Sequence, residues 1–456
     1  MVNNCLLKTV RFVDTKQWNV KHFFATSIIS RFPTESIGKH TIHITEKTKL
    51  SNEPEKEHKI LGISNEKGIF DAYVELGKNI NQAYIYVENG YLAYNPYRIN
   101  VGSIGLKTDL QKNDYISPAY VVFKCRETLL PEFLYLVLKS TVFNSIIREN
   151  TTGSVRQTLS YDKLATIKIP IPSIEAQKQI VDKYNKGICA ANSAINKADE
   201  LNNSIDLCLS NLLQLKPVVN QNHSVHGLIS TTTLKNLVGW GAKANSNPIK
   251  PQELFKSMVY QNMPLEYYCE INPKTIYPDD VEDVSFIPME CVSDIYGEII
   301  EHKNGKSMNR KGYTSFQEND VIWAKITPCM QNGKCAVATD LKNGYAYGST
   351  EFHVFRATKS VLPEYIHCFM RSKRLREAAM SYFTGSAGQQ RVGTDFLEAL
   401  TLPLLPIHSD NPNILTQETV VKKVAEIREQ IKELHIKAAD IRKQSEKEFE
   451  EAIFSE

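Results

Sequence analysis

The stretch that decides the fold is Ile174 to Leu213, IEAQKQIVDKYNKGICAANSAINKADELNNSIDLCLSNLL. Steps of alternately four and three residues from Tyr184 reach Ile188, Ala191, Ile195, Ala198, Asn202, Ile205, Leu209 and Leu212. This spacing is typical of the seam of a coiled coil rather than of the wider apolar stripe of a globular helix. Ser173 is expected to cap the helix, and Gly187 is expected to weaken it by about 1 kcal/mol relative to alanine. Such a seam requires a partner helix.

The C-terminal part of the chain contains the best candidate for that partner. The same stepping from Val420 reaches Val424, Ile427, Ile431, Leu434, Ala438, Ile441, Ser445 and Glu448. The heptad fades after Ile441, and Phe449 and Ile453 fall one step out of register. The heptads alone leave two interpretations open: each helix packs on its own domain, or the two helices pair with each other.

Composition indicates a folded protein of ordinary type. The 456 residues are 42% hydrophobic and 23% charged, which allows two or three domains with sizeable cores. The sequence has no apolar run near the roughly 18 residues of a membrane span, and MVNNCLLKTVRF lacks the core of a signal peptide. We therefore expect a cytoplasmic protein with no membrane partner. The nine cysteines form no CxxC pair, which favours reduced thiols over a metal site or disulfides.

The chain contains an internal repeat. SPAYVVFK at 117–124 corresponds to STEFHVFR at 349–356, which lies 232 residues later, and LPEFLYLVLKS from Leu130 corresponds to LPEYIHCFMRS from Leu362 at the same offset. The loops TGSVRQTLS and TGSAGQQRVGT follow, and IPIP then matches LPLLP. A period of this length is too long for a solenoid, so it indicates two copies of one domain.

The repeat predicts an α+β architecture. Two similar mixed α/β domains are expected, separated by two long helices that form an antiparallel coiled coil with pseudo-twofold symmetry. The expected boundaries are 1–172 for the first domain, 173–215 for the central helix, 216–250 for a linker, 251–407 for the second domain and 408–456 for the C-terminal helix. The alternative, two domains joined as independent beads, would leave both apolar seams exposed.

Two motifs resemble catalytic signatures, but each lacks an essential residue. Tyr94-Asn95-Pro96-Tyr97 is close to the NPPY signature of adenine methyltransferases but lacks its second proline. Asn304-Gly305-Lys306-Ser307 resembles the end of a phosphate-binding loop, yet Ile300 stands where the leading glycine belongs. We find no nucleophile elbow and no HExxH motif. The sequence therefore favours a binding protein with no catalytic residues, no metal and no cofactor.

Polar loops in both copies contain side chains that suit nucleic acid. Arg156 and Gln157 lie in the first loop, and Gln389, Gln390 and Arg391 lie in the second; arginine suits guanine and glutamine suits adenine in the major groove. Further candidates are Arg98, Asn100 and Lys107 in the first copy, Lys325, Thr327, Asn332 and Lys334 in the second, and the basic cluster Arg371, Lys373 and Arg374, which suits phosphates. The alternative is that these are solvated polar loops. The duplication favours two recognition domains for different half-sites.

The motifs TGSAGQQRV, LPLLP, IPIPSIEAQKQIVDK and GSTEFHVFR, in this duplicated order, closely resemble the specificity subunit of type I restriction–modification systems over nearly the whole chain. The resemblance implies two target-recognition domains, a bipartite double-stranded DNA target and no catalytic residues. It also implies two methyltransferase subunits that bind S-adenosylmethionine and dock on the helices, and restriction subunits with motor and nuclease activity. The insertion IHSDNPNILTQ at 407–417 departs from the family pattern before the second helix.

Two other functions stay open from the sequence. The chain could be the DNA-recognition region of a fused methyltransferase–endonuclease, although the Met1 start and the two-copy plan favour a whole subunit. It could also be a coiled-coil scaffold with no role in DNA binding. Binding of S-adenosylmethionine by the isolated chain would distinguish the first alternative, and a mobility-shift assay with the methyltransferase partner would distinguish the second.

Overall fold

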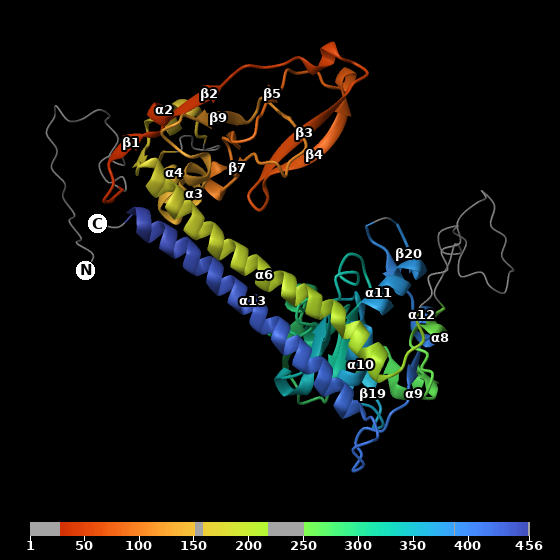
Figure 1. Ribbon diagram of the computed structural model, residues 1–456. Helices are drawn as coiled ribbons and strands as arrows, with labels where there is room; N and C mark the ends of the chain where they lie inside the picture. The colour runs from red at the N-terminus through yellow and green to blue at the C-terminus, as the bar shows by residue number, and fades with distance from the viewer. Residues whose placement is uncertain (1–27, 151–157, 218–249, 387, 455–456) are drawn as a thin grey trace. The chain divides into compact units, whose positions relative to one another are not determined.

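The computed structural model describes residues 28–150, 158–217, 250–386 and 388–454 (Figure 1). The chain divides into two compact units, of which the first comprises Met1–Ser193 with Lys437–Glu456 and the second comprises Ala194–Ile436. Helices α6 (Ile174–Leu212) and α13 (Gln417–Phe454) are the two predicted heptad helices. Each long helix therefore contributes one half to each unit.

The first unit contains two four-stranded sheets. One sheet is antiparallel with the order β2–β9–β6–β7, the strands being Thr41–Ile44, Val121–Cys125, Leu92–Tyr94 and Ile104–Leu106. The other has the order β4–β3–β8–β5, with strands Gly68–Leu76, Glu57–Ser64, Tyr115–Ile116 and Ile85–Tyr86, and β3 runs parallel to β8. The described part of this unit also contains the short pair β1–β10, Thr34–Ser36 with Lys168–Pro170, and the helices α2 Ile37–His40, α3 Pro131–Lys139, α4 Thr141–Asn150 and α5 Tyr161–Thr166.

The second unit repeats the strand orders of both sheets. Its antiparallel sheet has the order β12–β19–β16–β17, with strands Cys269–Ile271, Phe352–Ala357, Asp320–Ala324 and Cys335–Val337. Its second sheet has the order β14–β13–β18–β15, with strands Lys303–Lys306, Asp283–Ile287, Tyr345–Gly348 and Thr314–Gln317, and again one parallel pair, β13 with β18. The other elements are β11 Asn262–Pro264 paired with β22 Thr401–Pro403, β20 Phe383–Thr384 paired with β21 Arg391–Val392, and helices α8 Pro251–Leu254, α9 Leu265–Tyr268, α10 Pro363–Met370, α11 Lys373–Ala379 and α12 Thr394–Glu398. The predicted duplication is confirmed.

The long helices pack on the domains as well as on each other. In the first unit, Phe449 and Ile453 of α13 are buried in the same apolar cluster as Phe133 of α3 and Val181 of α6. The ring of Phe449 lies 6.3 Å from that of Phe133 and 5.8 Å from that of Tyr184. These two residues of α13 face the domain, and for this reason they do not follow the heptad spacing. Both interpretations left open by the sequence are therefore correct: each long helix packs on the domains, and the two helices also pair with each other.

In each unit the two helix halves run antiparallel. In the first unit, Lys183 of α6 forms an ion pair of 2.9 Å with Glu448 of α13. A Cβ atom added at Gly187 would overlap the hydroxyl of Ser445 and lie 3.0 Å from its Cβ atom. Gly187 therefore permits close approach of the two helices at this point, a role that the sequence did not indicate. In the second unit the other two halves share one apolar cluster, to which α6 contributes Ala198, Ile205 and Leu209 and α13 contributes Val420, Val424 and Ile431.

A buried glutamine fixes the start of each long helix to its domain. The hydroxyl of Ser173 accepts a hydrogen bond from Ala176 N, which confirms the predicted cap of α6. One turn into α6, Gln177 accepts from Leu130 N and donates to the carbonyls of Thr128 and Pro172. At the corresponding place in α13, Gln417 accepts from Leu362 N at 2.9 Å and donates to the carbonyls of Ser360 and Leu405 at 3.0 and 2.9 Å. Helix α13 thus begins at Gln417, the last residue of the insertion at 407–417.

Among the residues that the structure describes, no helix combines the length and the apolar character that a bilayer crossing requires. The cysteines in the same part of the chain are all free thiols.

Candidate nucleic-acid interface

In the second unit, two of the predicted polar segments lie against each other. The hairpin β20–β21 is joined to the segment 325–327 through Thr327 N, which donates to Gln390 O at 2.9 Å, and Val392 N, which donates to Lys325 O at 3.0 Å. Gln390 N also donates to the hydroxyl of Thr327 at 3.1 Å. The structure therefore brings together residues that are more than sixty positions apart in the sequence.

The connection between the two strands of this hairpin contains two glycines in the left-handed region. Gly385 and Gly388 have φ angles of +106° and +85°, which favour residues without a Cβ atom. The connection presents Gln389 to solvent and leaves Gln390 half-buried, and neither side chain forms a hydrogen bond or ion pair with another described residue. The same holds for the half-buried side chain of Lys325 and the exposed side chain of Asn332. These four side chains are available to a ligand.

Arg391 is placed differently, because its guanidinium is engaged within the chain. Nε and Nη2 donate to the two carboxylate oxygens of Glu351 at 2.9 and 2.7 Å, and Nη1 donates to Gln389 O at 2.8 Å. Hydrogen bonding to Arg391 lowers the pKa of Glu351, so that carboxyl group stays ionised. The fork holds the hairpin onto strand β19 instead of projecting away from it.

His353 forms a hydrogen bond that helps to fix the hairpin. Its Nε2 donates to Val392 O at 2.9 Å, and its Nδ1 accepts from the Asn272 amide at 3.0 Å, which requires a neutral ring. Burial lowers the pKa of His353, in agreement with this arrangement. The sequence reasoning missed Glu351 and His353 as partners of the hairpin, although both lie in the GSTEFHVFR motif.

The predicted basic side chains beside this hairpin bind mostly to the backbone of their own unit. Lys334 Nζ donates to the carbonyls of Met289 and Val292 at 2.9 and 2.8 Å. Arg371 Nη2 donates to the carbonyls of Asp294 and Ile295 at 2.7 and 3.0 Å, and Arg374 Nη2 donates to Lys216 O at 2.6 Å. Lys373 is exposed and lies 4.0 Å from Glu377. Of these four cations, only Lys373 points to open solvent with a weak internal partner.

In the first unit, Arg98 and Asn100 flank a short turn between β6 and β7. Arg98 is exposed, Asn100 is half-buried, and neither side chain has a hydrogen-bond partner among the described residues. Asn95 starts the same turn, since its side chain accepts from Tyr97 N. Arg156 and Gln157, the predicted loop residues of this copy, lie outside the described residues.

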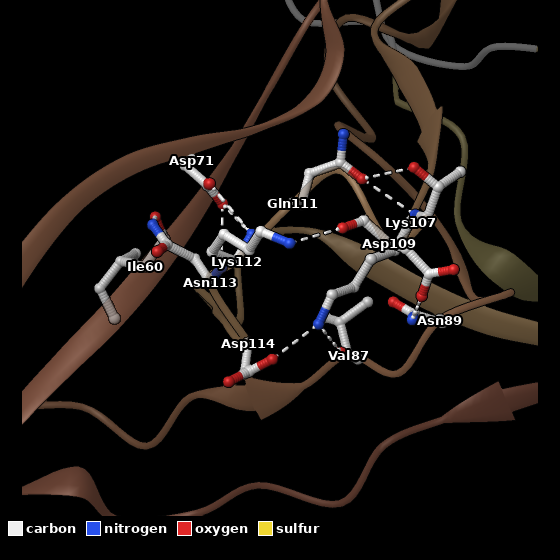
Figure 2. A network of polar contacts seen from close by, with 11 residues as sticks. Ile60, Asp71, Val87, Asn89, Lys107, Asp109, Gln111, Lys112, Asn113 and Asp114 are labelled. Atoms are coloured by element: carbon white, nitrogen blue, oxygen red, sulfur yellow. Dashed lines mark hydrogen bonds and ion pairs between the residues drawn. The ribbon is translucent and has the colours of Figure 1, made fainter.

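Lys107 is not available to DNA in this arrangement. Figure 2 shows its side chain directed inward, where Nζ donates to Val87 O at 2.7 Å and to the Asp114 carboxylate at 2.8 Å. Only 4% of the residue is exposed. The backbone N–H groups of Lys112 and Asn113 in the same loop donate to the Asp71 carboxylate of strand β4. Lys107 therefore closes the loop between β7 and β8.

Residues 41–186 match the family model described as the type I restriction modification DNA specificity domain. The chain is 38% identical over 150 residues to the EcoAI type I restriction enzyme specificity subunit of Escherichia coli, covering 32% of this chain and 25% of that protein. It is 37% identical over 159 residues to the EcoEI specificity subunit of the same organism, covering 34% and 26%. These matches thus span about a quarter of the length of both relatives.

One solved structure extends the similarity to the whole chain. It is described as the structural basis underlying complex assembly and conformational transition of the type I R-M system, and it aligns with a TM-score of 0.54 at 14% identity, covering 94% of this chain and 98% of the other. At this identity the alignment shows a shared fold. Together with the sequence matches, it confirms the resemblance: residues 41–186 match the type I restriction modification DNA specificity domain, and the chain is similar to the specificity subunits of type I restriction–modification systems.

Proposed function

We propose that this chain is the DNA-recognition subunit of a type I restriction–modification enzyme and has no catalytic activity of its own. Each domain recognises one half of a bipartite double-stranded target. The proposed recognition domains are residues 1–172 and 251–407, the spacer helices lie within 173–215 and 408–456, and the linker is 216–250.

The observation that carries this proposal is the duplication of one topology with different side chains at the same place. Both units have the same strand orders, and the polar loop follows the same pair of helices in each copy. The loop sequences are TGSVRQTLS and TGSAGQQRVGT, so the scaffold is shared but the polar side chains differ. This is the pattern expected of two binding domains for different half-sites.

Within the second domain, the side chains best placed for base contact are Gln389 and Gln390, with Lys325 on the segment bonded to the hairpin. Asn332 is a further exposed candidate. Arg391 acts through the hairpin that it holds. In the first domain, Arg98 and Asn100 are the corresponding described candidates, and Arg156 and Gln157 stay as a prediction. We assign Lys107 and Lys334 to the fold because their ammonium groups are already bonded, and Arg374 because it is half-buried and its Nη2 donates to Lys216 O.

The partners follow from the same proposal. Two methyltransferase subunits dock on the paired long helices, and restriction subunits with motor and nuclease activity join the complex in the cytoplasm. The chain itself binds no cofactor, and methyl transfer takes place on the partner subunits. A chain that belonged to a fused methyltransferase–endonuclease would instead bind S-adenosylmethionine, so calorimetric titration with that compound separates the two functions.

The test of DNA recognition is a binding selection on randomised duplex with the methyltransferase subunits present. Replacing Gln389 and Gln390 by Ala should remove base preference in one half of the target and leave the other half intact, since a bidentate base contact contributes about 1–3 kcal/mol of discrimination. The exposed Gln430 on α13 provides the matched glutamine-to-alanine control.

A second variant distinguishes residues that hold the hairpin in place from residues that contact the DNA. Glu351→Gln removes the charge that fixes Arg391 but leaves the glutamines in place, so it should blur the same half-site preference less than the double alanine variant. A uniform loss of affinity over all sequences, with a smaller salt dependence, would instead assign the glutamines to the phosphate backbone. Unchanged preference in both variants would refute the assignment of this hairpin.

A further inference from the structure

Three arginine side chains from separate elements line one cavity of the second unit. The cavity has a volume of about 350 Å³, and its lining includes Arg371 at the end of α10, Arg376 on α11 and Arg428 on α13. Asn202 and Ile205 of α6 form another part of its wall. The cavity therefore lies where the domain meets the helix halves of the same unit.

None of the three guanidinium groups forms an ion pair with a carboxylate in the described part of the chain. Arg371 donates to the carbonyls of Asp294 and Ile295, as noted above, and Arg376 Nη1 donates to Gln331 O at 2.6 Å. Arg428 Nη1 lies 2.9 Å from His367 Nδ1, which accepts the hydrogen bond as a neutral ring.

The remaining lining groups do not balance these charges. Lys373 adds a fourth cation, whereas Asp206 and Glu377 are the two carboxylates, which leaves a surplus of two positive charges. The Asp206 carboxylate accepts from the backbone N–H of Arg374, and Glu377 lies 4.0 Å from Lys373.

Clustered and partly buried cations without counter-charges are costly, so their retention requires a reason. Burial, followed by the repulsion from Arg428, lowers the pKa of Arg371 to about 10. Arg376 Nε is buried and has no hydrogen-bond acceptor among the described residues. An anion in the cavity would offset both the charge and the unpaired donor.

Two neighbouring cavities adjoin this one but differ from it in charge. One of about 300 Å³ shares Asn202, Arg371 and Arg428 with the first, and another of about 550 Å³ shares Asn202 and Arg376. Carboxylates line both neighbouring cavities, Glu298, Glu364 and Glu429 in one and Asp199 and Asp294 in the other, so the surplus of positive charge is confined to the first cavity.

We propose that this arginine cavity binds a small phosphorylated anion, such as inorganic pyrophosphate or the phosphate groups of a nucleotide. Guanidinium forks match phosphate oxygens in charge and geometry, and two surplus positive charges suit a phosphoryl dianion. A concave site walled by four helices favours a small molecule over the backbone of a duplex. The site is independent of the proposed base contacts on the hairpin.

The test is calorimetric titration of the full chain with inorganic pyrophosphate at constant ionic strength. Arg376→Gln and Arg428→Gln should each weaken binding about tenfold, the factor for one lost charge-assisted hydrogen bond. Arg442→Gln is the matched control, because it removes the same charge from α13 outside the cavity and should bind normally. Asp206→Asn removes a lining carboxylate and should strengthen binding, which a merely misfolded variant would not do.

Competition with duplex DNA identifies the source of the phosphate. A small-anion site predicts that saturating pyrophosphate leaves DNA affinity unchanged and that the two arginine variants bind DNA normally. The proposal is overturned if the wild-type chain does not bind pyrophosphate, if all variants bind it equally, or if the arginine variants lose DNA affinity while pyrophosphate does not bind.

Discussion

Replacing Gln417 by Ala should destabilise the second unit by about 3 kcal/mol. The side chain is completely buried and makes three hydrogen bonds, to Leu362 N and to the carbonyls of Ser360 and Leu405. Alanine leaves one N–H and two C=O groups buried without these partners, and each lost bond contributes about 1 kcal/mol. In a unit of this size 1 kcal/mol shifts the melting midpoint by about 2–4 °C, so the expected decrease is about 6–12 °C.

Scanning calorimetry of the intact chain, supported by urea unfolding, measures this effect. Gln177→Ala should destabilise the first unit to a similar extent, since Gln177 makes the equivalent three bonds there. Gln430→Ala on α13 is the control, because Gln430 is exposed and should change the unfolding free energy by no more than about 0.5 kcal/mol. Losses no larger than that of the control would show that the glutamines do not join the helices to the domains.

Three further perturbations test other parts of the structure. Gly187→Leu should lower the free energy of unfolding by about 1–3 kcal/mol, because the larger side chain pushes α6 away from α13. Ser445→Gly should recover part of that loss in a double-mutant cycle measured by urea unfolding. Additive effects of the two substitutions would contradict close approach at this point. Lys107→Met should lower the unfolding free energy of the first unit by about 1–3 kcal/mol, while the salt dependence of DNA binding stays as in the wild type. Unchanged stability with a smaller salt dependence would instead identify Lys107 as a phosphate contact. Burial, and then Arg428, hold the pKa of His367 well below 6.5, so near pH 6 the unfolded chain binds a proton that the folded chain does not. The free energy of unfolding should therefore fall as the pH decreases through about 6.5. A smaller pH dependence of the melting midpoint in His367→Asn would verify that His367 is the source.

Periodicity and repetition predicted most of the architecture. The heptads located both long helices, and the 232-residue offset located two domains whose strand orders proved identical. The heptad spacing is local and the offset is a repeat along the chain, so both can be recognised without knowledge of tertiary contacts. Phe449 and Ile453 left the pattern because their burial depends on a domain more than three hundred residues earlier in the chain.

The candidate site was harder to predict, because residue type does not reveal whether a donor is already bonded. Lys107 and Arg98 look equivalent as basic residues in polar loops, yet Lys107 is buried against Asp114 and Arg98 is exposed. Arg391 is paired with Glu351, which lies forty positions earlier and carries no local sign of that role. Such pairings arise from strand order and register, which composition and spacing do not specify.

The way in which the hairpin is fastened has a consequence for how this protein can evolve. Two of the bonds that attach it to the segment 325–327 join main-chain atoms, and these do not depend on which side chains occupy positions 389 and 390. Point substitutions at those two positions therefore alter the presented surface while the backbone keeps its place. A lineage can sample new ligand preferences there one residue at a time, whereas changes at Glu351 or His353 would disturb the platform itself.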